Sequence, residues 1–138
     1  AELGTRQGAT GSTRDKLEAA FEGIAAQENL LAERLLSWLG ARNDCHIVGR
    51  GYTPGTRVPT IAFRFDGHDS GEVARAMDAH GIAIRFGDFH SRRLVEDLKE
   101  AHDSGVLRVS MVHYNTLAQV DKLTAALGEV VSKQAMAS

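Results

Sequence analysis

The chain has 138 residues, of which 43% are hydrophobic and 25% are charged, as is ordinary for a globular domain. A chain of this length can bury a core within one domain. Its formal net charge of −2 argues against broad electrostatic binding to nucleic acid or to an anionic membrane surface. No apolar run approaches the roughly 18 residues that a membrane span requires. The composition therefore favours a globular protein that binds neither nucleic acid nor membrane.

The cysteine content and the N-terminus add two expectations about origin. Cys45 is the only cysteine, which excludes an internal disulfide and is typical of a reducing, cytoplasmic environment. No signal or transit peptide pattern is visible. The chain opens on AELG without an initiator Met, so we expect a cleavage product, an expressed fragment or a truncated reading frame.

A long helix is predicted near the N-terminus, after a lead-in at residues 1–11 that we expect to be flexible. Ser12 can cap this helix, with Asp15 as its reciprocal partner three residues later. Gly40 supplies a stop after about 26 residues, which corresponds to about 40 Å. Because a small domain needs less, part of the apolar stripe is expected to face a partner outside this chain; a bundle or coiled-coil helix is the alternative. The stripe comprises Leu17, Phe21, Ile24, Leu31, Leu35 and Trp38.

Four β-like runs follow the long helix. The runs at 58–65, 82–86 and 106–111 alternate apolar and polar residues, which predicts half-buried strands. A shorter run covers 45–49. On the apolar face of the run at 82–86 we expect Ile82, Ile84 and Phe86.

Three further helices are predicted between and after these strands. One begins near Asp69 or Ser70, one follows the polar GDFHS stretch, and one begins at Thr116 with Gln119 as its reciprocal partner. The middle helix presents Leu94, Val95, Leu98 and Ala101. We infer an α+β domain over residues 12–133, a long helix and then a small mixed β-sheet of about three or four strands with helices on one face. Residues 134–138 are expected to form a frayed tail.

Two strand arginines are the strongest candidates for ligand binding. Arg85 lies in IAIRF and Arg108 lies in VLRVSM, and each points away from the apolar face of its strand. If the two strands are neighbours, both guanidinium groups lie on one surface, where they suit a planar carboxylate or a phosphate. The alternative is that both are solvated arginines paired with Asp or Glu side chains.

Polar loops after these strands complete the candidate site. Asp88, His90 and Ser91 follow the first strand, and Asn115 lies shortly after the second. The order Asp, His, Ser does not indicate a catalytic triad, because triads are assembled in space and not along the sequence. The six histidines form no HExxH, HxH or Cys/His cluster, so no metal site is expected. Cys45 is expected to be a buried, unreactive thiol.

Three segments carry a resemblance to a known family. RVPTIAF, GIAIRFGDF and GVLRVSMVHYNTLAQVDKLTAAL occur in this order, after a long helix that ends in LLSWL. Together they resemble the C-terminal small domain of the class V aminotransferases, pyridoxal-phosphate enzymes of the cysteine desulfurase-like group. The similarity runs from about residue 8 to residue 131, and RVS followed by YNT is its most specific part.

The resemblance implies a role for each arginine. In that family the arginine of the RVS strand holds the α-carboxylate of the amino-acid substrate, and here it would be Arg108. Arg85 matches an arginine near the active-site cleft, and the loop at 88–91 and Asn115 would border that cleft. The implied cofactor of the full-length enzyme is pyridoxal phosphate, and the implied partner is a large domain that this chain lacks.

Two departures from the family pattern matter. Desulfurases of this group carry their persulfide-forming cysteine at the position of His90, so desulfurase chemistry by that route is not supported. The family's Schiff-base lysine lies in the large domain, whereas Lys16, Lys99, Lys122 and Lys133 all lie in helical patterns. We therefore expect no catalytic residue in this chain and no pyridoxal phosphate bound to it in isolation.

Two hypotheses about function remain. In the first, the chain is the small, carboxylate-binding domain of a pyridoxal-phosphate enzyme and is inactive alone. In the second, it is a stand-alone, non-catalytic module that binds an anion or a partner. The long apolar stripe adds that the chain could form a homodimer through its first helix.

Overall fold

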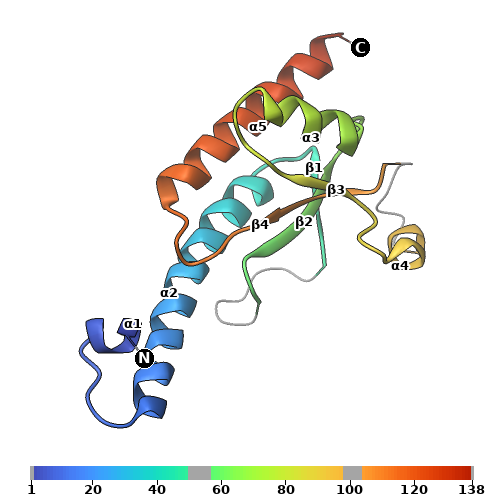
Figure 1. Cartoon of the computed structure of the whole chain (residues 1–138). Helices are drawn as coiled ribbons and strands as arrows, with labels where there is room; N and C mark the ends of the chain where they lie inside the picture. The colour runs from blue at the N-terminus through green and yellow to red at the C-terminus, as the bar shows by residue number, and fades with distance from the viewer. Residues whose placement is uncertain (1, 50–56, 98–103, 138) are drawn as a thin grey trace.

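The computed structural model describes residues 2–49, 57–97 and 104–137, and it has the predicted α+β architecture (Figure 1). A long helix precedes a small sheet, and further helices alternate with the strands. In chain order the elements are α1 (Glu2–Arg6), α2 (Thr13–Gly40), β1 (Cys45–Val48), β2 (Thr60–Phe65), α3 (Ser70–Asp78), β3 (Arg85–Gly87), α4 (Arg92–Asp97), β4 (Val106–Ser110) and α5 (Leu117–Ala137).

The four strands form one sheet in the order β1-β2-β4-β3. Each neighbouring pair is antiparallel, so the expectation of a mixed sheet was wrong. Helices α3 and α4 lie between β2 and β4 along the chain, yet β4 runs antiparallel to both β2 and β3, because the direction of pairing is set by contacts between segments far apart in the sequence. β4 therefore lies in the centre beside β2, and β3 is an edge strand.

Helix α2 has the predicted start, with both halves of the capping box formed. Asp15 N donates to Ser12 Oγ at 3.3 Å, and Ser12 N donates to Asp15 Oδ2 at 2.7 Å. The Ser12 hydroxyl also donates to Asp15 Oδ2 at 2.8 Å, and this bond, followed by the one from Ser12 N, lowers the pKa of the Asp15 carboxyl group. The helix then continues to Gly40 as expected.

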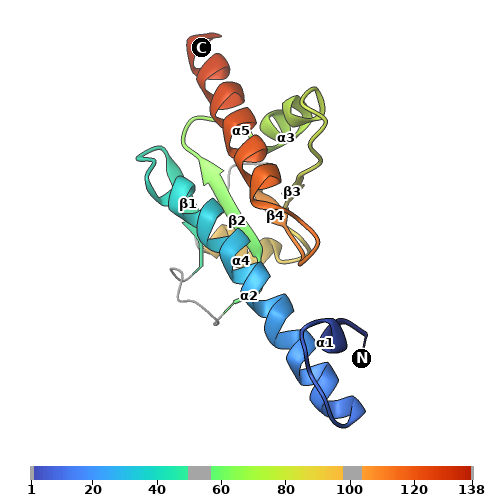
Figure 2. The ribbon, with the colours of Figure 1, turned by 90° about the vertical axis from the view of Figure 1, so that its left-hand side faces the viewer.

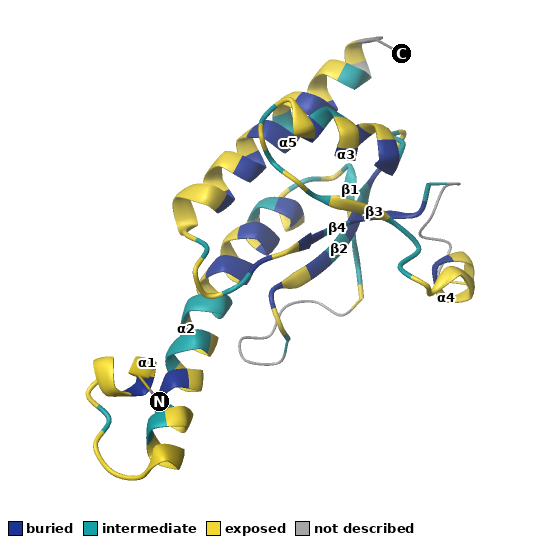
Figure 3. Cartoon of the chain, viewed as in Figure 1, coloured by how far each residue is buried: buried dark blue, intermediate teal, exposed yellow. Residues whose placement is uncertain are grey.

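Only the C-terminal half of α2 lies in the core. Leu31 and Leu35 are fully buried, whereas Phe21 is 65% exposed and Leu17 is 42% exposed. Figure 3 shows the change from exposed to buried residues along this helix. The short helix α1 folds back on the exposed half, where Gly4 is buried against it; residues 2–6 are thus helical within the stretch expected to be a flexible lead-in.

The core lies between one face of the sheet and helices α2, α3 and α5 (Figure 2). The strands contribute Phe63, Phe65 and Leu107, each at most 1% exposed. In α3, Val73, Ala74 and Met77 are buried. In α5 the buried residues include Val120, Leu123, Leu127 and Val130. The expectation that helices cover one face is therefore confirmed for these three helices.

Strand β3 begins later than the sequence predicts. The expected strand covered 82–86, but pairing with β4 begins at Arg85 and ends at Gly87. Ile82 N donates a hydrogen bond to Met77 O of α3 at 3.3 Å. Ile82 is therefore still tied to the end of the helix, and the chain joins the sheet only at Arg85. Phe86 lies at the open edge, 39% exposed, with the guanidinium of Arg75 at 5.3 Å from the centre of its ring.

The helix after β3 is described only in part. α4 covers Arg92–Asp97, and within it Val95 is buried as expected while Leu94 is 57% exposed. The predicted inward residues Leu98 and Ala101 lie outside the described residues. No helix among the described residues is both long and apolar enough to cross a membrane.

Candidate functional site

The structure places the two strand arginines directly opposite each other. Arg85 of β3 pairs with Arg108 of β4 in the antiparallel register. Leu107 and Val109 point into the core, so Arg108 between them points to the face that α2, α3 and α5 leave open. Arg108 is half-buried and Arg85 is exposed. The prediction that both guanidinium groups share one surface is therefore confirmed.

The charges of these two arginines are not balanced within the described part of the chain. Other arginines have carboxylate partners, including Arg34 with Asp121 at 2.7 Å and Arg42 with Asp44 at 2.9 Å. Neither Arg85 nor Arg108 forms an ion pair with a carboxylate among residues 2–49, 57–97 and 104–137. Like charges directly opposite in a sheet are unfavourable, and an uncompensated pair of this kind is typical of an anion-binding site.

A residue that the sequence did not single out, Phe89, orients one of the two arginines. The guanidinium carbon of Arg108 lies 4.0 Å from the centre of the Phe89 ring. Arg108 Nε is buried and lacks a hydrogen-bond partner among the described groups. Stacking on an aromatic face fixes the plane of a guanidinium while its edges stay available for hydrogen bonds. Phe89 is the one aromatic side chain in the polar stretch 87–91, and this was the signal available in the sequence.

The loop at 88–91 is a tight turn that presents Phe89. Asp88 Oδ1 accepts a hydrogen bond from His90 N at 3.1 Å, and Asp88 O accepts one from Ser91 N at 2.9 Å. Phe89 and His90 both have positive φ angles, 51° and 64°. The predicted loop residues are therefore brought next to Arg108 through Phe89, and Asp88 shapes the turn with both its side chain and its backbone.

Asn115 is used within its own turn. Its Oδ1 accepts from Val112 N at 2.9 Å, and its Nδ2 donates to Gln119 Oε1 at 3.1 Å. Its backbone carbonyl accepts from Gln27 Nε2 of α2 at 3.0 Å. These bonds join the end of β4 to the start of α5 and to the long helix. The geometry therefore gives Asn115 a structural task in addition to any contact with a ligand.

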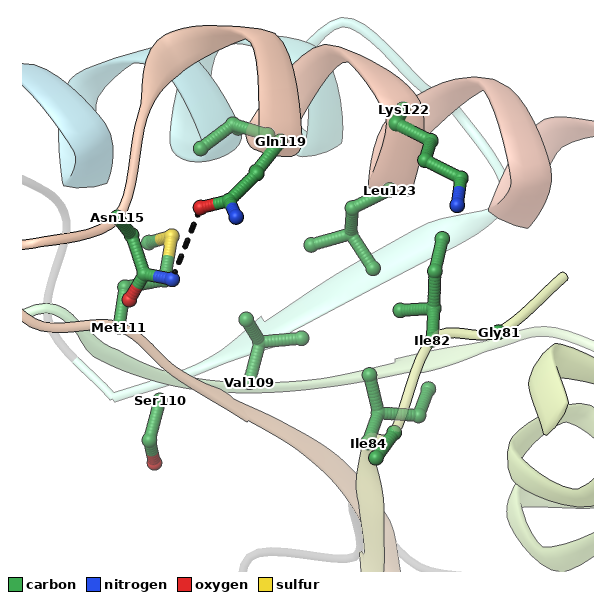
Figure 4. A pocket seen from close by; sticks show the side chains of 12 residues that line it. Gly81, Ile82, Ile84, Val109, Ser110, Met111, Asn115, Gln119, Lys122 and Leu123 are labelled. Carbon is green, nitrogen blue, oxygen red and sulfur yellow. Dashed lines mark hydrogen bonds between the residues drawn. The ribbon is translucent and has the colours of Figure 1, made fainter.

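A pocket of about 290 Å³ lies between the approach to β3, the end of β4 and the first turns of α5, on the helix-covered side of the sheet (Figure 4). Its walls are mainly apolar, and Gln119 and Lys122 of α5 lie at its rim. Ser110 and Asn115 also line it, but Arg85 and Arg108 do not. The lining residues are Gly81, Ile82, Ala83, Ile84, Val109, Ser110, Met111, Asn115, Gln119, Val120, Lys122 and Leu123.

The other side chains that could carry chemistry are either unreactive or take part in local structure. Burial raises the pKa of the Cys45 thiol to about 12, so it is protonated and weakly nucleophilic near neutral pH. His46 pairs with Asp66 at 2.9 Å and His68 lies within hydrogen-bond distance of Val131 O, so both belong to local structure. Within the described ranges, no group of three or more His, Cys, Asp or Glu side chains could hold a metal ion.

The fold and the site together define a class of protein. The chain is a helix-plus-antiparallel-sheet domain that displays an uncompensated arginine pair on its open face. Residues 14–123 match the family described as Aminotransferase class-V. The chain therefore belongs to the class V aminotransferase family, as its resemblance implied.

Individual relatives agree with this assignment. An aminotransferase-like protein of Gibberella zeae is 39% identical over 113 residues, which cover 80% of this chain and 28% of that protein. A cysteine desulfurase-like protein of Aspergillus flavus is 32% identical over 117 residues, covering 82% and 27%. The structure of a cysteine desulfurase from Thermococcus onnurineus shares the fold, with a TM-score of 0.74, 22% identity and coverage of 87% of this chain and 29% of that one. The chain spans less than a third of each of these relatives.

The family implies pyridoxal phosphate as the cofactor. It requires a lysine amine, groups that hold the phosphate, and usually a carboxylate at the pyridine nitrogen. The pocket offers one lysine, Lys122, but no Asp or Glu lines it. The other described lysines are Lys16 on α2 and Lys133 on α5, and Lys133 lies 3.8 Å from Glu129. The described residues therefore do not form a pyridoxal-phosphate site by themselves.

Proposed function

We propose that this chain is the C-terminal, carboxylate-binding domain of a pyridoxal-phosphate enzyme of the class V family, cytosolic and inactive without a large domain. Its task in the whole enzyme is to hold the carboxylate of an amino-acid substrate. Arg108 is the principal contact and Arg85 lies beside it. The cofactor and its lysine are supplied by the part of such an enzyme that this chain does not contain.

One observation carries the proposal. Arg108 lies opposite a second arginine, stacks on Phe89, and has no carboxylate partner in the described ranges. A guanidinium held in this way can form two parallel hydrogen bonds to a carboxylate. Charge-assisted bonds of this kind contribute about 1.5–3 kcal/mol each when solvent is excluded. The partial coverage of the relatives supports the assignment as one domain of a larger enzyme.

The loop argues against one branch of the family's chemistry. The resemblance places the persulfide-forming cysteine of desulfurases at the position of His90, and the single cysteine, Cys45, lies on strand β1. The pKa of that thiol is raised to about 12, so it does not replace the missing nucleophile. We therefore propose amino-acid chemistry without a persulfide on this chain.

The first test asks whether the chain alone is inert toward the cofactor. Purified protein is mixed with pyridoxal phosphate, its visible absorbance is recorded, and the mixture is reduced with borohydride before peptide mass spectrometry. We expect no stoichiometric adduct at any single lysine. A single-site adduct on Lys122, abolished in Lys122→Gln but not in Lys133→Gln, would contradict the proposal.

A second candidate function rests on the exposed half of α2. Phe21 and Leu17 leave apolar surface uncovered, which suits a stand-alone module that binds a partner or a second copy of itself. This alternative predicts concentration-dependent association of the chain. The first proposal does not depend on such association.

A further inference from the structure

We propose that the arginine pair is built for a substrate with two anionic groups, an acidic amino acid or the corresponding oxo acid. Arg108 holds one carboxylate and Arg85 holds the second. This inference rests on the proposed function and makes it narrower. It assigns a separate role to Arg85, which otherwise has none beyond lying next to the clamp.

The charges of Arg85 and Arg108 favour a ligand with two negative charges. The register brings two guanidinium groups to one spot, and no carboxylate of the described residues pairs with either. A ligand with one carboxylate would compensate one of these charges and leave the other opposed by solvent alone. A ligand with two carboxylates would compensate both. Since like charges directly opposite are unfavourable, the pair favours the dianion.

The two arginines lie in different surroundings. Arg108 is half-buried on the central strand β4, its plane is set by Phe89 at 4.0 Å, and its Nε is buried without a partner. Arg85 is exposed on the edge strand β3. The first is therefore a fixed contact and the second an adjustable one. This difference suits a ligand whose α-carboxylate is held rigidly by Arg108 and whose side-chain carboxylate is bound by the more flexible Arg85.

The distance between the two arginine side chains suits a short dicarboxylate. Side chains opposite each other in an antiparallel pair have Cβ atoms about 4.5–5.5 Å apart. The guanidinium groups of two opposed arginines can be separated by the Cβ–Cβ distance or by more, because they repel each other. A diacid with a chain of four or five carbons places its carboxylates at a comparable separation. Short dicarboxylates therefore match the pair better than long ones.

One competing arrangement must be separated from this one. Two arginines can also grip a single carboxylate from two sides, in which case Arg85 would strengthen the binding of any acid. The two arrangements differ in how removal of Arg85 affects mono- and dicarboxylates. In the dianion site, only dicarboxylates lose affinity.

The experiment compares succinate with butyrate, two acids of equal chain length. The full 138-residue chain is labelled with ¹⁵N, and binding is followed through the backbone amide signals of residues 85–91 and 106–110 and the Nε–H signals of arginine. The variants are Arg85→Gln and Arg108→Gln, with Arg93→Gln as the control, since Arg93 is an exposed arginine on the nearby helix α4. Dispersion of the amide spectrum verifies that each variant is folded.

We expect the wild-type chain to bind succinate about tenfold more tightly than butyrate, in line with one additional charge-assisted contact. Arg85→Gln should remove this preference and leave butyrate binding within about twofold. Arg108→Gln should weaken both acids about tenfold or more, and Arg93→Gln should change neither by more than about twofold.

The outcomes separate the two levels of the argument. If Arg85→Gln weakens both acids equally, or if the wild type shows no preference for succinate, the dianion site is overturned while the carboxylate clamp stands. The proposed function itself fails if Arg108→Gln changes the binding of neither acid. It also fails if the wild-type chain binds neither acid at concentrations low enough to avoid saturating other sites.

Discussion

At the scale of single residues, the unusual feature is the pair Phe89 and His90. Both have positive φ angles, which non-glycine residues adopt at a cost of about 1–2 kcal/mol. Strain of this kind is retained at sites where geometry matters more than stability. Here it places the Phe89 ring against Arg108. The sequence predicts a polar loop but not this conformation, because nothing in Asp-Phe-His-Ser requires positive φ.

This strain leads to a prediction for His90. Glycine adopts positive φ without strain, but it also makes the unfolded chain more flexible and so increases the entropy lost on folding. Because the relief of strain is the larger effect, His90→Gly should raise the free energy of unfolding by about 0.5 kcal/mol net. The bond from the backbone N of residue 90 to Asp88 Oδ1 is retained in this variant. Urea unfolding measures the change, and Ser91→Gly, for which no positive φ was found, should instead be destabilising. A loss of stability in His90→Gly would show that its side chain contributes more than its φ angle costs.

At the scale of elements, the site depends on how closely β3 approaches the start of β4. A Cβ added to Gly105 would lie 2.3 Å from the carbonyl carbon of Gly87 and 2.4 Å from its oxygen. Gly105 also has a φ of 75°. Gly87 pairs with Val106 two residues from the arginine pair, so the spacing at Gly105 sets the spacing at Arg85 and Arg108.

Gly105→Ala is therefore expected to be costly, and Gly81→Ala offers a matched control. Both positions have positive φ, 75° and 66°, but an added Cβ at Gly81 meets no atom within 4 Å. We expect Gly81→Ala to cost about 1 kcal/mol from backbone strain alone. Gly105→Ala should cost more by about 1–3 kcal/mol, because backbone must also move, and should shift the amide signals of β3. Equal losses in the two variants, measured by urea unfolding, would mean that the close approach to Gly87 is not limiting.

Local patterns allowed most helices and strands to be predicted, whereas pairing did not follow from them. Alternation placed Arg108 on the face opposite the apolar residues of its strand, and its neighbours Leu107 and Val109 are indeed buried. Capping residues marked the starts of α2 and α3. The antiparallel direction of every strand pair was missed, since it depends on contacts far apart in the sequence. The opposition of Arg85 and Arg108 was predicted only on condition that their strands are neighbours, and the contact with Phe89 was not foreseen.

At the scale of the whole molecule, α2 belongs to two environments. Its C-terminal half packs on the sheet and on α5, and Arg34 of this half pairs with Asp121 of α5 at 2.7 Å. Its N-terminal half extends beyond the sheet and is contacted by α1 (Figures 1 and 3). The relatives are more than three times as long as the matched region.

This division predicts opposite consequences for two apolar side chains on the same helix. Phe21→Ser should change the free energy of unfolding by no more than about 0.5 kcal/mol, because Phe21 is 65% exposed. Leu35→Ala should cost about 2–5 kcal/mol, because Leu35 is fully buried and its removal leaves a cavity. Urea unfolding at low protein concentration provides both values.

Sedimentation of the same proteins over a wide concentration range then tests the self-association hypothesis. If the exposed half of α2 joins two copies, Phe21→Ser weakens their association without lowering the stability of the monomer. A wild-type chain that stays monomeric throughout would refute that hypothesis, and a large loss of stability in Phe21→Ser would show that the N-terminal half is part of the folded core.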